Sequence, residues 1–119
     1  MEHELSAFYD ITHGEGLAIL TPAWMEHILN DDTLPYFVDF ARNVWGLTGG
    51  SDMELARAGI DALKMFFFET MGIPANLRAV GITDQSNFDV MARKACEGSK
   101  GSFVPLSEQD IKEIFAAAF

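Results

Sequence analysis

Apolar residues recur at the spacing of an α-helix along almost the whole chain, and this periodicity limits the folds open to it. The clearest run follows Ser51 and Glu54, which form a capping box at a helix start. One side of the segment behind them carries Ala56, Ile60, Leu63, Phe67 and Met71. Gly72 and Pro74 end this segment, which we expect to be the longest helix, with its Met and Phe stripe in the core.

Other segments show the same pattern. Residues 14–21 are apolar on all sides and should be buried, and Pro22 is expected to kink or restart that helix. Further helices are predicted over residues 34–45 and 88–98, and after a second capping box formed by Ser107 and Asp110. Phe103 and Val104 are too few for a strand. We therefore predict an all-α fold, a helical bundle of about six helices, in a single domain over residues 1–119.

Composition excludes several classes of function. The formal net charge of −10 disfavours nucleic acids and anionic membranes as partners, because phosphate binding needs clustered Lys and Arg. No apolar run reaches the roughly 18 residues of a membrane span. The start of the chain lacks the basic region of a signal peptide. One cysteine, Cys96, cannot form an internal disulfide and fits a reducing, cytoplasmic compartment.

Two histidines near the start, His3 and His13, are ten positions apart. At about 100° per residue they would lie on different faces of one helix, so a shared site needs a break between them. Asp10 is expected to end the first helix, and Thr12 and Glu15 form a capping box that places His13 in the first turn of the next. There the helix dipole disfavours the imidazolium, and neutral imidazole is the form that binds metal.

Taken by itself, this pattern is weak evidence for a metal site. A histidine near a helix start is more often a surface or capping residue, and metal sites need three or four ligands that converge. The histidines of this chain have no metal-type spacing, and His27 is interpreted as structural.

A resemblance to a known family strengthens the interpretation. The N-terminal segments 3–10, 13–14 and 17–22 (HELSAFYD, HG and LAILTP) are similar to part of the metal-binding signature of the iron-containing alcohol dehydrogenases, in particular the bacterial NAD(P)H-dependent butanol dehydrogenase branch. The likeness extends over essentially the whole chain, through Trp24–Glu26, Asn43–Gly46, Gly72–Arg78 and Pro105–Ile111.

The resemblance implies that the chain is the helical C-terminal part of such an enzyme. Relative to the family it would be truncated at the N-terminus and would lack the nucleotide-binding domain. His13 would be one metal ligand of four, with Fe²⁺ as the default ion and Zn²⁺ as an alternative. His3 would line the cofactor side of the site, beside the metal and the nicotinamide of NAD(P)H. The substrates implied are small primary alcohols and aldehydes, and the chain by itself is expected to be inactive. No residue is assigned a further catalytic role.

A second hypothesis is a free-standing helical module without chemistry, which acts through binding or oligomerisation. Under the first hypothesis, surface near Phe8, Leu17 and Leu20 would be left uncovered. Uncovered apolar surface favours self-association, so we expect a homo-oligomer.

Overall fold

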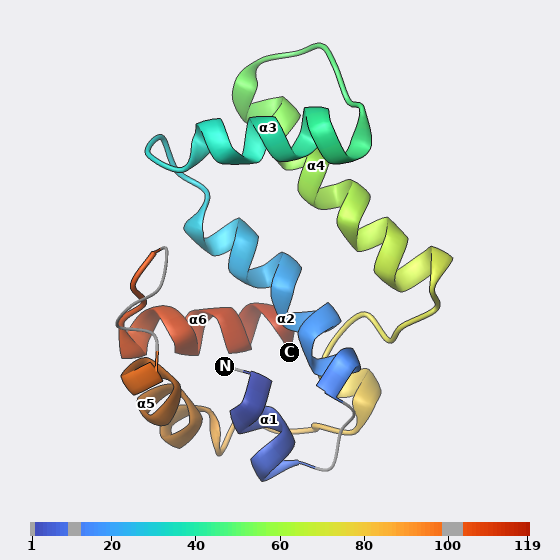
Figure 1. Ribbon diagram of the computed structural model, residues 1–119. Coiled ribbons are helices and arrows are strands. Elements are labelled where there is room, and N and C mark those ends of the chain that lie inside the picture. The colour runs from blue at the N-terminus through green and yellow to red at the C-terminus, as the bar shows by residue number, and fades with distance from the viewer. Residues whose placement is uncertain (1, 10–12, 99–103) are drawn as a thin grey trace. The chain divides into compact units, whose positions relative to one another are not determined.

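The computed structural model describes residues 2–9, 13–98 and 104–119, and these residues form six α-helices and no strand (Figure 1). The prediction of an all-α fold with about six helices is therefore confirmed. The α-helices are α1 (Glu2–Phe8), α2 (His13–Ile28), α3 (Leu34–Trp45), α4 (Asp52–Met65), α5 (Phe88–Gly98) and α6 (Glu108–Ala118). A π-helical turn, η1 (Phe66–Thr70), follows α4, and a 3₁₀ turn, η2 (Arg78–Val80), precedes α5. No helix among the described residues is long and apolar enough to cross a membrane.

The chain divides into two compact units. The first comprises residues 1–23 and 74–119, and the second comprises residues 24–73. The first unit thus contains α1, the larger part of α2, η2, α5 and α6, while α3, α4 and η1 belong to the second. The expectation of one domain over residues 1–119 stays a prediction.

In the first unit, α5 and α6 pack against each other and α1 packs on α5 (Figure 1). The Phe88 ring lies 5.4 Å from the Phe115 ring, measured between centroids, and 5.9 Å from the Phe119 ring. The predicted capping box at the start of α6 is confirmed in both directions between Ser107 and Asp110. The helix start and the buried aromatic contact together fix which face of α6 turns inward.

The prediction that the helix restarts at Pro22 is wrong. The helix continues from His13 to Ile28 with Pro22 in its interior and fully buried. A proline inside a helix costs about 3 kcal/mol because it removes one backbone hydrogen bond and crowds the preceding turn. Burial of the proline ring and the tertiary packing of α2 offset this cost.

One face of α2 is exposed to solvent, which the apolar sequence of residues 14–21 did not predict. Ala18, Ile19 and Leu20 are buried as predicted, but Leu17 is 44% exposed. Leu17 is four residues after His13, which is also exposed, and residues four apart share a helix face. Because Leu20 is buried, it is excluded from the uncovered surface at which we expected it.

The second unit is built on the close contact of α3 with α4. Gly59 of α4 faces Ala41 of α3, and both are buried. A Cβ atom on Gly59 would lie 2.9 Å from the Ala41 Cβ and 3.2 Å from its Cα, so the absent side chain permits this approach. The first half of the predicted capping box is confirmed, because the Ser51 hydroxyl accepts from the Glu54 N–H at 3.2 Å.

The helix that we predicted to be the longest, α4, is α-helical only as far as Met65. At 14 residues α4 is shorter than α2, which has 16, and η1 extends it. The Met71 N–H donates to the Phe66 carbonyl at 2.9 Å, an i to i−5 bond that abandons the α-helical period. The apolar stripe therefore leaves the buried face: Ile60 is buried, Phe67 is half-buried and Met71 is 56% exposed. Assigning Met71 to the core was wrong for this reason.

We predict that Gly59→Ala destabilises the second unit. The added methyl overpacks the contact with Ala41, which costs about 1–3 kcal/mol, while alanine returns about 1 kcal/mol of helix propensity. The expected net loss is about 1 kcal/mol in the free energy of unfolding, measured by urea denaturation followed by circular dichroism.

The control is the double variant Gly59→Ala with Ala41→Gly, which makes room for the new methyl. It should be more stable than the sum of the two single effects. A stabilised Gly59→Ala protein would contradict the close approach of α3 and α4.

Candidate metal centre

The two histidines singled out in the sequence are the starting point of the site. His3 is the second residue of α1, and His13 is the first residue of α2. α1 ends at Phe8, so the expected break between the two helices is present. The residues predicted to produce the break, Asp10 and Thr12, lie outside the described residues, as does Phe103 of the short extended segment.

The break brings the two imidazole rings together. The ring centroids of His3 and His13 are 5.4 Å apart, and the ring planes are stacked with an angle of 20°. Both residues are exposed. Their proximity agrees with the expectation that they serve one site, while the roles of His13 toward a metal and of His3 toward a cofactor stay predictions.

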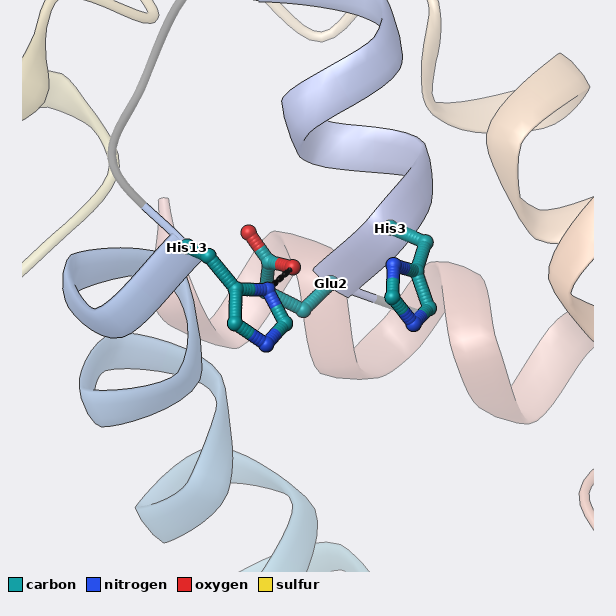
Figure 2. Close-up of side chains that lie close together, drawn as sticks. All are labelled: Glu2, His3 and His13. Atoms are coloured by element: carbon teal, nitrogen blue, oxygen red, sulfur yellow. Dashed lines mark hydrogen bonds and ion pairs between the residues drawn. The ribbon is translucent and has the colours of Figure 1, made fainter.

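A third residue, Glu2, completes the cluster. Its carboxylate contacts Nδ1 of His13, and Figure 2 shows this contact as a dashed line between α1 and the start of α2. The side chain of Glu2 is 4% exposed, whereas that of His13 is 55% exposed. The contact therefore joins a buried acceptor to one edge of a ring whose remaining surface is largely open.

The buried position of Glu2 depends on Gly16. A Cβ atom on Gly16 would lie 2.5 Å from Oε1 and 2.7 Å from Cγ of Glu2, which is too close for any ordinary contact. Gly16 is three residues after His13, so both lie on the same face of α2. One carboxylate oxygen of Glu2 thus occupies the space above Gly16, and the other reaches the His13 ring.

The three residues fit a divalent cation. Glu2, His3 and His13 each offer one ligand atom, and these atoms all lie within 4.8 Å of one another. Two imidazoles and a carboxylate form a mixed nitrogen and oxygen donor set, which suits Zn²⁺ and Fe²⁺ better than Mg²⁺ or Ca²⁺.

Sequence reasoning missed Glu2. The signal that could have found it is the pairing of His13 with a small residue one turn later, Gly16, opposite a segment that carries a carboxylate. That signal becomes interpretable only when the mutual approach of α1 and α2 is known, because neither helix predicts its partner's position.

Comparisons with known proteins identify the family. All of residues 1–119 match the family model described as "Fe-containing alcohol dehydrogenase family, C-terminal". The chain is 50% identical over 123 residues to NADH-dependent butanol dehydrogenase A of Clostridium acetobutylicum, an alignment that covers 100% of this chain and 31% of that protein. It is 44% identical over 119 residues to NADH-dependent butanol dehydrogenase B of the same organism, covering 97% of this chain and 30% of the relative.

A solved structure agrees with these matches. The substrate- and cofactor-free form of the aldehyde reductase YqhD from E. coli superposes with a TM-score of 0.84 at 30% identity. The superposition covers 99% of this chain and 31% of that structure. The chain therefore spans less than a third of the length of the relatives it matches. Its sequence, its helical fold and these matches show that the chain belongs to the iron-containing alcohol dehydrogenase family. It corresponds to the C-terminal part of these enzymes, in the butanol dehydrogenase branch.

Proposed function

We propose that this chain is the metal-site and substrate-side part of an iron-containing, NAD(P)H-dependent alcohol dehydrogenase that interconverts primary alcohols and aldehydes. The observation that carries the proposal is the cluster of Glu2, His3 and His13, whose two histidines fall within the segments that resemble the family's metal-binding signature. Two relatives named as NADH-dependent butanol dehydrogenases support the substrate class and the cofactor. A cytoplasmic location, expected from the lone cysteine, is part of the same proposal.

In this proposal His13 holds the metal and His3 lines the cofactor side. Nδ1 of His13 contacts Glu2, which leaves Nε2 as the ring nitrogen available to a metal. When bound, the metal supplies a Lewis acid for the substrate oxygen, and the nicotinamide supplies or accepts the hydride. The stacked His3 ring gives that side of the site a flat, partly apolar wall that limits where a substrate can lie.

The donor set leaves iron and zinc as candidates for the ion. The family's name favours Fe²⁺, and zinc accepts the same imidazole and carboxylate ligands. The intact enzyme would add ligands to those of this chain, so the site described here is one part of a larger coordination shell.

A second candidate function is self-association, and the exposed Leu17 favours it. Phe8, also expected at such a contact, is half-buried, with the Lys94 ammonium 5.1 Å from its ring centroid. We therefore propose a homo-oligomer whose contact includes Leu17 and excludes Leu20.

The first prediction of the proposed function concerns metal affinity. We expect the chain to bind Zn²⁺ with a dissociation constant on the order of micromolar, about −8 kcal/mol, which is weaker than the roughly 10–16 kcal/mol of complete four-ligand zinc sites. His13→Ala should abolish this binding in calorimetric titration. Glu69→Gln removes an exposed carboxylate that is in no such cluster and should leave the affinity unchanged. Nanomolar binding, or binding that survives His13→Ala, would contradict the assignment.

The second prediction concerns activity. The chain by itself should not reduce butanal, but it should support activity when it replaces the matching region of the Clostridium butanol dehydrogenase A. In that chimera, His13→Ala should lower kcat/KM more than roughly 100-fold, because losing a ligand costs more than losing an outer partner. The assay follows NADH oxidation with added Fe²⁺ or Zn²⁺. An active His13→Ala chimera would refute the role of His13 as ligand.

The third prediction concerns association. Sedimentation at two concentrations should show an oligomer, and Leu17→Glu should shift it toward the monomer, because a charge is costly in an apolar contact. Val44→Glu alters an exposed apolar residue of α3 and serves as the control. A monomer at every concentration would eliminate this candidate function.

A further inference from the structure

The buried carboxylate of Glu2 has a consequence for the chemistry of His13. When the Glu2 carboxylate is ionised it can only accept a hydrogen bond, so the ring nitrogen that contacts it, Nδ1, then carries a proton. In the neutral ring, which is the form that binds metal, the lone pair is then on Nε2. The contact therefore selects one of the two neutral tautomers.

The position of Glu2 restrains the orientation of the ring as well. Its side chain is almost fully buried, and Oε1 and Cγ fill the space above Gly16. A carboxylate confined in this way cannot follow a rotating ring. His13 is thus held at one edge by a buried group, while 55% of its side chain is exposed.

We propose that Glu2 is a positioning residue, which holds His13 in the Nδ1–H tautomer and directs Nε2 toward a divalent metal ion. The proposal rests on the proposed function of His13 as a metal ligand. Gly16 takes part indirectly, because it provides the space in which the Glu2 carboxylate lies. A carboxylate that contacts the far nitrogen of a ligating histidine raises the basicity of the ligand, and losing such a partner typically costs 10–100-fold in metal affinity.

A purely structural role would give a different pattern. If Glu2 only tied α1 to α2, its replacement would lower stability, and any loss of metal affinity would follow from unfolding. If Glu2 positions the ring, the tautomer of His13 changes in the folded protein, even without metal. The tautomer is therefore the decisive measurement.

The first measurement is the tautomer of His13 in the metal-free chain. Long-range ¹⁵N–¹H correlation spectra in alkaline buffer distinguish Nδ1–H from Nε2–H, and His13→Ala assigns the signals. We expect Nδ1–H in the wild type and a shift toward Nε2–H in Glu2→Ala. Glu2→Gln should retain part of the Nδ1–H form because its amide oxygen still accepts. A wild-type ring in the Nε2–H form, or a Glu2→Ala ring unchanged, overturns the proposal.

The second measurement is the affinity for Zn²⁺ by competition with a chromogenic chelator. Glu2→Ala should lose roughly 10–100-fold, and Glu2→Gln less. Gly16→Ala keeps the carboxylate but displaces it, so it should also lose affinity although alanine favours the helix. Glu4→Gln removes the same charge two residues along α1, where the side chain turns away, and should change nothing. Melting curves show whether each variant is folded.

The two measurements separate the two hypotheses. If the wild type shows the Glu2-dependent tautomer but binds no Zn²⁺, Glu2 holds the ring and the proposed metal role of His13 fails. If Zn²⁺ binds through His13 with equal affinity in Glu2→Ala and Gly16→Ala, the proposed function stands and the positioning role is overturned.

Discussion

The burial of the Glu2 carboxylate is the constraint on which the site depends. A charged group removed from water is strongly unfavourable unless other groups pair with it. The contact with His13 supplies such a group, and Gly16 supplies the space. α1 has seven residues, too few for an isolated helix to be stable. Its order therefore comes from tertiary contacts: the Glu2 contact, the fully buried Leu5 and the packing on α5.

One face of α2 packs in the core, and the other carries the candidate ligand. Ala18, Ile19 and Leu20 are buried, whereas His13 and Leu17 face outward. The imidazole thus stands at the border of the packed core, with one edge against a buried carboxylate and the other open. This position suits a ligand that must stay fixed in orientation and still be reached by a metal and a substrate.

Features with local causes were predictable from the sequence, and features that arise from tertiary packing were not. The capping pattern of Ser107 and Asp110 requires four consecutive residues, and it predicted the start of α6 correctly. The continuation of α2 through Pro22 and the π-helical end of α4 depend on what packs around them, so local patterns gave the wrong result. The same distinction holds in the site. The proximity of His3 and His13 followed from the break between two helices, whereas Glu2 became visible only when α1 and α2 were placed together.

If His13 binds a metal as proposed, the location of the cluster links metal binding to the stability of the helix pair. Glu2 belongs to α1 and His13 belongs to α2, so an ion bound by His13 would favour the arrangement in which the Glu2 contact is formed over a frayed one. A ligand that prefers the folded form stabilises it by RT ln(1 + [L]/Kd), about 2.7 kcal/mol at 100 times the Kd. Without metal, the Glu2 contact performs this task in part, because it restrains both helices before any ion arrives. Under the proposed positioning role, the carboxylate would lower the ordering cost of metal binding as well as direct the imidazole, and both effects would come from one buried carboxylate on the shorter helix.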